Sequence, residues 1–180
     1  MGGLLVGLAV PALPALAHTP YAQWDVFRKS NLQLLTSHAD LPGDDTGELW
    51  VEVLREKLPL SRAMVSRAHD MPRIAALLKT NQSNLAVLSY MHARLMFTGS
   101  APFEDYAPLI LEVLVDNGQH LLVARPDLPA HHGYLIAAAL TNETRRLHLV
   151  NPGKGIFGMR VHGGAKAFFD GERLGMPAEQ

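Results

Sequence analysis

Short apolar runs alternate with amphipathic stretches along most of this chain, which is the pattern of an α/β protein. The clearest unit begins at Asp70 and ends at Gly99. Asp70 followed by Met71-Pro72 is typical of a helix start, because an acidic side chain caps free N–H groups and proline fits the first turn. Residues 85–88 are too few for a core helix and predict a strand buried on both faces. A second amphipathic helix then runs up to Gly99.

The remaining elements follow from the same patterns. Apolar runs predict strands at 31–35 (ending at Thr36-Ser37), 62–67, 109–115 and 120–123. Asn117-Gly118 between the last two runs is a strong hairpin signal. Helices are expected from Asp45, which has a capping-box glutamate three residues later, from Pro129, and near 165–170. The expected fold is α/β, with a mostly parallel sheet and helices on both faces.

The N-terminal segment carries no charge from residue 2 to residue 17 and closes on Ala15-Leu16-Ala17. Small residues at those positions suit a signal peptidase, so we interpret 1–17 as an export signal. A membrane anchor is the alternative, although a span needs about 20 apolar residues and this run contains two prolines. The predicted location is periplasmic or secreted, with membrane contact only through 2–17 if they are retained. A linker (18–30) and one domain (31–175) would follow.

Composition removes several classes of function. Lys and Arg number 16 against 17 Asp and Glu, giving a net charge of −1. Such a balance supplies no field for nucleic acid. The chain has no cysteine, which excludes disulfides, thiolate metal sites and cysteine nucleophiles.

Several segments carry a resemblance to a known family: Glu48-Leu49-Trp50, the run 73–78 (RIAALL), the run 82–89 (QSNLAVLS), the run 122–125 (LVAR) with Asp127-Leu128-Pro129, and the run 158–165 (GMRVHGGA). Their order resembles the periplasmic solute-binding proteins of type II topology, most closely the TAXI branch that serves TRAP transporters. The resemblance covers residues 32–170. It implies a non-enzymatic, exported protein that binds a solute.

The chain departs from that family at one decisive point. Family members have two lobes that close on a ligand. Here the strand at 109–115 passes through one tight turn into the strand and helix that, in the family, follow the second lobe. We therefore expect a single lobe of the type II periplasmic-binding-protein fold. The glycine-rich segment after the family's first strand is also replaced, by Thr36-Ser37-His38.

Candidate ligand-binding residues stand where the predicted strands end, because ligands of parallel α/β sheets lie beyond the carboxyl ends of the strands. They are Thr36, Ser37, Ser66, His69, Ser89 and Tyr90. Hydroxyl groups and the free N–H groups of helix N-termini suit a carboxylate or another small anion. The alternative is that Ser37 and Ser89 only cap the helices that follow them.

The sequence shows no pattern typical of a metal-binding, catalytic or phosphate-binding site. The nine histidines lack metal-ligand spacing. His38, His69 and His92 fall near strand ends and could converge, but we interpret them as surface or capping residues. No nucleophile elbow occurs, and the run 152–155 (PGKG) lacks the spacing of a phosphate loop. We expect no enzyme, no metal and no cofactor.

Two functions remain open. The first is an exported solute-binding-protein-like domain that recognises a small anionic solute. The second is an accessory or scaffold subunit that uses the same fold to dock onto a larger periplasmic or membrane complex. For the second function, Tyr21, Trp24 and Phe27 offer aromatic anchors of the kind found in interface cores.

Overall fold

A computed structural model gives the fold of residues 31–172 and 174. The predicted export segment, the linker and the aromatic residues Tyr21, Trp24 and Phe27 lie outside these described residues. Within the described ranges, no helix is long and apolar enough to cross a membrane. The elements are β1 (Gln33–Ser37), α1 (Leu41–Lys57), η3 (Pro59–Ser61), β2 (Met64–Ala68), α2 (Met71–Lys79), β3 (Leu85–Ser89), α3 (Tyr90–Thr98), η4 (Glu104–Tyr106), β4 (Glu112–Asp116), β5 (His120–Ala124), α4 (Ala130–Thr141), α5 (Thr144–Leu147) and α6 (Gly163–Phe169).

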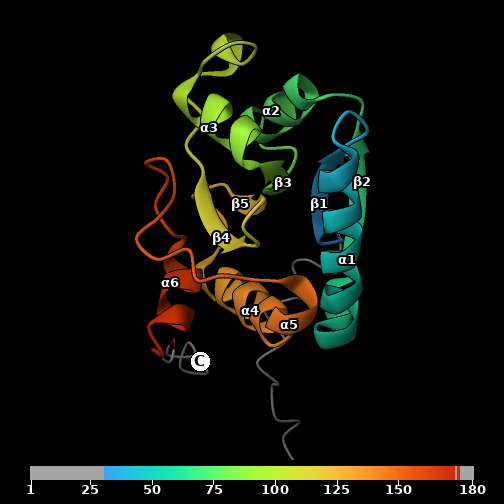
Figure 1. Ribbon diagram of the computed structural model, residues 1–180, viewed down its shortest axis with the longest axis vertical. Helices are drawn as coiled ribbons and strands as arrows, with labels where there is room; N and C mark the ends of the chain where they lie inside the picture. Colours follow the sequence, from blue (N-terminus) through green and yellow to red (C-terminus); the bar gives the residue numbers. More distant parts are fainter. Residues whose placement is uncertain (1–30, 173, 175–180) are drawn as a thin grey trace, which may run out of the picture.

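The sheet has five strands in the order β2-β1-β3-β5-β4 (Figure 1). β1 pairs parallel with β2 and β3, whereas β5 pairs antiparallel with β3 and β4. The α/β prediction is confirmed, but the expectation of a mostly parallel sheet is not, because two pairings are parallel and two are antiparallel. The hairpin is the reason, because Gly118 takes a φ of 83° and the chain reverses there. The carboxyl ends of β1, β2, β3 and β4 therefore share one edge of the sheet, which we call the carboxyl edge.

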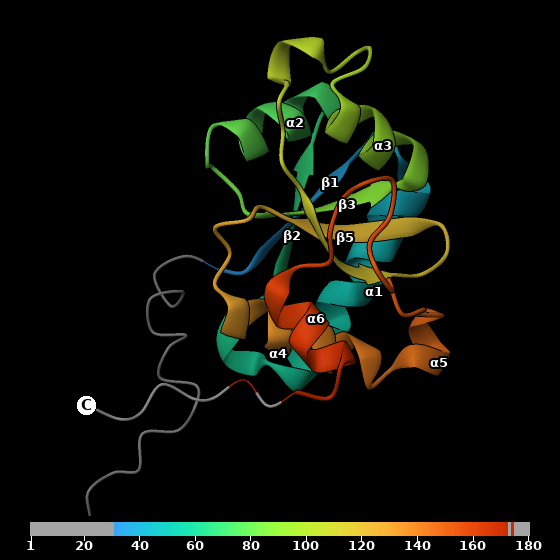
Figure 2. The same ribbon diagram turned by 90° about the vertical axis from the view of Figure 1, so that its left-hand side faces the viewer.

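Helices cover both faces of the sheet, with α2 and α3 on one side and α1, α4 and α6 on the other (Figure 2). Trp50, Leu54 and Ile136 fill the core on the α1 side. Ile74 and Leu78 belong to the core on the α2 side. Strands β3 and β5 lie between these two cores, which explains why they read as continuous apolar runs.

Helix boundaries agree with the sequence signals except at α1. Asp70 caps α2 by accepting the N–H of Arg73 at 2.8 Å, and Gly99 ends α3 with a φ of 66°, both as expected. The start predicted at Asp45 is wrong, because α1 begins at Leu41 and its N-cap is Asp40. Asp40 accepts the N–H of Gly43 at 3.1 Å, and a proline follows in the first turn, where its missing N–H costs nothing.

The segment after α5 runs along the outer strand of the sheet. Val150 donates its N–H to the Asp116 carbonyl at 2.8 Å, and Val113 donates to the Arg160 carbonyl at 2.9 Å. These bonds use backbone groups that an edge strand would otherwise expose. They also fix the loop 151–160 beside β4, and the loop extends toward α3 (Figure 2). Phe157 of this loop lies beside residues of α3.

Candidate functional site

Three helices begin close to the carboxyl edge, and the side chain of the N-cap residue accepts a first-turn N–H in each of them. Asp40 caps α1, Asp70 caps α2 and Ser89 caps α3, where its hydroxyl oxygen accepts the N–H of His92. Two of these caps are carboxylates, which repel an incoming anion. The first-turn N–H groups are thus poorly suited to the anion-binding role that the strand ends suggested.

Thr36 and Ser37 are both buried and serve local structure. The Thr36 hydroxyl donates to Asp44 Oδ1 at 2.6 Å, and the Ser37 hydroxyl accepts the N–H of Ala39 at 3.1 Å. Burial alone would raise the pKa of Asp44, but hydrogen bonds from Arg67 and Thr36 outweigh it and the pKa is lowered. Both hydroxyl groups are engaged inside the protein, so neither lines a space for ligand.

Ser66 and His69 stand apart from these hydroxyls. Ser66 lies beside Leu35 in the register of β1 and β2, and Leu35 belongs to the core on the α2 side. Thr36 faces α1, since a Cβ added at Gly47 would lie 2.4 Å from its methyl group. Thr36 and Ser66 are therefore on opposite faces of the sheet, and His69 is exposed beyond β2. The structure does not bring these three candidates together.

Ser89 belongs to a second group, which we call the edge cluster (Asp40, Ser89, His92 and His120). Asp40 lies between the two imidazoles, with Oδ2 at 3.7 Å from His92 Nδ1 and Oδ1 at 3.7 Å from His120 Nε2. Its Oδ2 atom is buried without a hydrogen bond. His120 was not among the expected residues, because its position beside Ser89 depends on the antiparallel register of β3 and β5. Among the described residues no group of side chains is arranged to hold a metal ion.

The edge cluster contains a serine, a histidine and an aspartate, but their geometry is not that of a proton relay. The Ser89 hydroxyl lies 2.8 Å from His92 Nδ1, which is the same ring nitrogen that faces Asp40. A catalytic triad needs the serine on one imidazole nitrogen and the carboxylate on the other. The Ser89 oxygen is also the helix cap. We interpret the cluster as a contact that fixes α1, α3 and β5 to one another.

Tyr90 is the expected residue with the most informative contacts. Its hydroxyl lies 2.7 Å from each carboxylate oxygen of Asp116, which is buried and also accepts the N–H of Gly118 at 2.7 Å. Burial, together with the Asp116 carboxylate, raises the pKa of Tyr90 to about 12. The phenol therefore stays neutral at physiological pH and fixes its ring in place.

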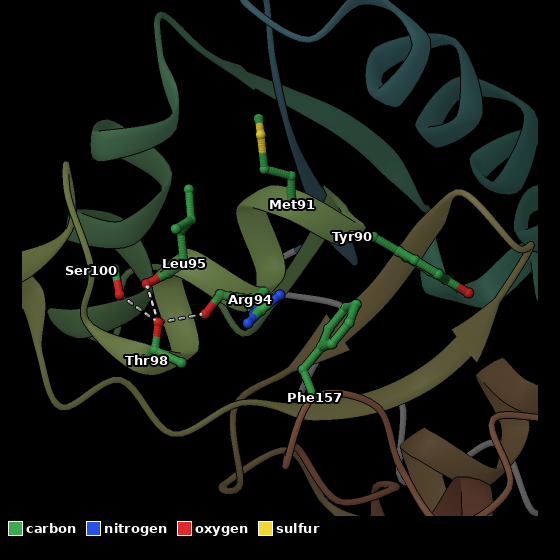
Figure 3. Close-up of a pocket in the computed structure, with 7 residues that line it drawn as sticks. All are labelled: Tyr90, Met91, Arg94, Leu95, Thr98, Ser100 and Phe157. Atoms are coloured by element: carbon green, nitrogen blue, oxygen red, sulfur yellow. Dashed lines mark hydrogen bonds between the residues drawn. The ribbon is translucent and has the colours of Figure 1, made fainter.

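The Tyr90 ring forms one wall of a hollow of about 440 Å³ (Figure 3), which we call the α3 groove. Phe157 meets this ring edge to face, with centroids 5.6 Å apart. The residues that line the groove are Tyr90, Met91, Arg94, Leu95, Thr98, Ser100 and Phe157. Only Tyr90 was expected from the sequence. Arg94 follows Tyr90 by one helical turn, a spacing that could have suggested it, whereas nothing in the sequence places Phe157 there.

No family model, no curated protein sequence and no solved structure matches this chain.

Proposed function

We propose that this chain is a non-enzymatic, exported binding protein, reduced to one lobe of the type II solute-binding kind, that recognises a small organic anion. The observation that carries the proposal is the connection from β4 to β5. It is a turn between Asp116 and His120, at the point where the family resemblance places the second lobe. In this proposal, the carboxyl edge corresponds to the side of the first lobe that faces the second lobe in two-lobed family members.

The α3 groove supports the small-molecule part of this proposal. Sites for small ligands commonly have volumes of about 300–1,000 Å³ and apolar walls with a few polar groups. The groove has a volume of about 440 Å³, aromatic walls at Tyr90 and Phe157, and a cation at Arg94. Because the groove is open to water, we expect a dissociation constant on the order of 1 mM.

The experiment is a ligand panel on the purified protein. The panel contains dicarboxylates, amino acids and aromatic monocarboxylates, and binding is measured by thermal shift and by calorimetry. We expect at least one acid to raise the melting temperature and to give a saturable heat, and its neutral amide to give neither. A flat response across the whole panel would contradict the proposal.

A docking subunit is the second candidate, and a separate observation favours it. Leu41 at the start of α1 is 67% exposed, and Met91 at the start of α3 is 61% exposed. Large apolar side chains with this exposure at one edge are typical of a surface that meets another protein. Retention of a defined partner from a membrane extract, lost in a Leu41→Ser, Met91→Ser double variant, would support docking. A monomer that retains none would count against it.

A further inference from the structure

We propose that the α3 groove is a binding site for an aromatic carboxylate. The ring of the ligand would lie against Tyr90 and Phe157, and its carboxylate would pair with Arg94. This inference rests on the proposed function and gives it a site and a ligand class.

Arg94 supplies the charge that selects an anion. Its guanidinium makes no ion pair and no hydrogen bond with any of the residues that the structure describes. It lies one helical turn after Tyr90, and Figure 3 draws it between the aromatic pair and the hydroxyls of Thr98 and Ser100. A free guanidinium can bind a carboxylate through two parallel N–H donors.

The two hydroxyls of the groove have little to offer an anion. Thr98 donates its proton to the Arg94 carbonyl at 2.9 Å. Ser100 lies 2.8 Å from the Thr98 oxygen and donates to it, since the Thr98 proton is already used. Both protons are engaged within the chain, so these oxygens present lone pairs. An anion in the groove is therefore directed to Arg94.

Phe157 supplies the preference for an aromatic body. It has a φ of 54°, a left-handed conformation that is unfavourable for a bulky side chain, and it is still 41% exposed. Paired backbone hydrogen bonds between Ile156 and Met159, of 3.0 and 2.9 Å, hold the loop in this shape. Strained residues that the surrounding structure fixes are concentrated at ligand sites. The loop keeps an exposed ring beside Tyr90, where a second aromatic ring can stack edge to face.

The remaining wall is adaptable. Met91 and Leu95 line the groove on the α3 side, and an unbranched methionine can adjust to ligands of different shape. A ligand without a ring would leave the apolar side chains of the groove in contact with water, and a ligand without a carboxylate would form no ion pair with Arg94. The best occupant therefore combines the two groups on a short linker, as 3-phenylpropionate does.

The test uses the full chain and three probes: 3-phenylpropionate, its neutral analogue 3-phenylpropanamide, and succinate. Calorimetry gives the affinity, and backbone amide shifts in NMR spectra give the site. We expect 3-phenylpropionate to bind most tightly and to shift amides of 94–98 and 157. Arg94→Gln should weaken its binding roughly three- to tenfold, as expected for one charge-assisted contact at an exposed site. Phe157→Asn, which tolerates the left-handed backbone, should weaken it by a similar factor.

The matched control is Arg145→Gln. Arg145 is exposed on α5, a helix whose Leu147 packs into the core on the α1 side, so its loss should leave the affinity unchanged. Unchanged binding of 3-phenylpropionate by Arg94→Gln, or amide shifts confined to 36–37 and 66–69, would contradict the assignment of the site to the α3 groove but leave the proposed function standing. The same holds if succinate or another panel member binds and 3-phenylpropionate does not. A protein that binds none of the panel would contradict both.

Discussion

At the scale of single residues, two hydroxyl–carboxylate contacts hold the carboxyl edge together. Tyr90 donates to the buried Asp116, and Thr36 donates to Asp44. A buried carboxylate that loses a donor keeps the cost of its desolvation, so each contact should matter more than a surface hydrogen bond. The residues that sequence patterns placed in a ligand site thus act first on stability.

We expect Tyr90→Phe to lower the free energy of unfolding by about 2 kcal/mol, the usual scale for a hydrogen bond to a charged group. Asp116 would keep only the N–H of Gly118 among its side-chain contacts. Urea unfolding measures the loss. Tyr134→Phe is the matched control, because the Tyr134 hydroxyl bonds to no residue in the described ranges and its removal should cost little.

The difference in unfolding free energy between the wild type and Tyr90→Phe should depend on pH, and its direction follows from the pKa of Tyr90. The pKa of Tyr90 is raised from 10.0 to about 12 in the folded state. A raised pKa contributes stability that is complete below the unfolded value and is lost as the pH climbs through the folded value. The advantage of the wild type over Tyr90→Phe should therefore be constant up to about pH 10 and shrink between pH 10 and 12. A difference that persists unchanged at pH 12 would contradict the contact.

Thr36→Val tests the second contact, since it keeps the shape and removes the donor to Asp44. The pKa of Asp44 is lowered from 3.8 in the wild type, so its contribution is present above that pH and is lost as the pH falls below it. We expect the variant to lose about 1–2 kcal/mol at neutral pH, and the difference to narrow in acid. Urea unfolding between pH 7 and pH 3 checks this. Thr80→Val, which loses bonds only to the neutral Ala76 carbonyl and the neutral Gln82 amide, should show no such narrowing.

At the scale of elements, α4 and α6 approach each other through glycine. A Cβ added at Gly164 would lie 1.7 Å from the carbonyl oxygen of Ala130, and one added at Gly133 would lie 2.1 Å from a ring nitrogen of His162. Neither position has room for a side chain. The close approach of the two helices at these positions therefore depends on residue size.

Gly164→Ala should force α6 away from α4 and cost about 2–3 kcal/mol, because a backbone carbonyl cannot rotate out of the way. Gly163→Ala is the control in the same helix, since nothing lies within 4 Å of its added Cβ. It should be neutral or slightly stabilising. Thermal unfolding of the two variants compares them directly, and equal melting temperatures would rule out the close contact.

Local signals in the sequence were sufficient for most elements. The Asp70 cap, the Gly99 stop and the Asn117-Gly118 turn each depend on neighbours within a few residues, and the structure has all three. The start of α1 was misplaced to Asp45 because two acidic start signals compete in one loop. The one at Asp40 prevails, since a proline follows it in the first turn.

The candidate site could be predicted only in part, because it depends on contacts between distant segments. Tyr90 was found from its place at a strand end. The pairing of His92 with His120 through Asp40 needs the register of β3 against β5, and the approach of Phe157 to α3 needs the path of a loop along β4. Neither register nor loop path is encoded in local periodicity.

At the scale of the whole molecule, one sheet separates two cores. Trp50 and Ile136 lie in the core on the α1 side, and Ile74 lies in the core on the α2 side. The edge cluster joins α1 and α3, which cover opposite faces. Because the central strands β3 and β5 are buried between the two layers, loss of one layer exposes the sheet that covers the other. We therefore expect the two layers to unfold together.

A matched pair of core variants tests this. Ile74→Val and Ile136→Val each remove one methylene from a side chain with 0% exposure, one on each face. Each should lower the free energy of unfolding by about 1 kcal/mol. In a Trp24→Phe background, Trp50 is the one tryptophan left, and its fluorescence reports the α1 side, whereas far-ultraviolet circular dichroism reports all helices. If the layers are one cooperative unit, either variant shifts both urea transitions equally, because each probe then follows the same equilibrium. If Ile74→Val moves the dichroism transition and leaves the fluorescence transition in place, the α2–α3 layer unfolds by itself, and a ligand in the α3 groove would stabilise only that layer.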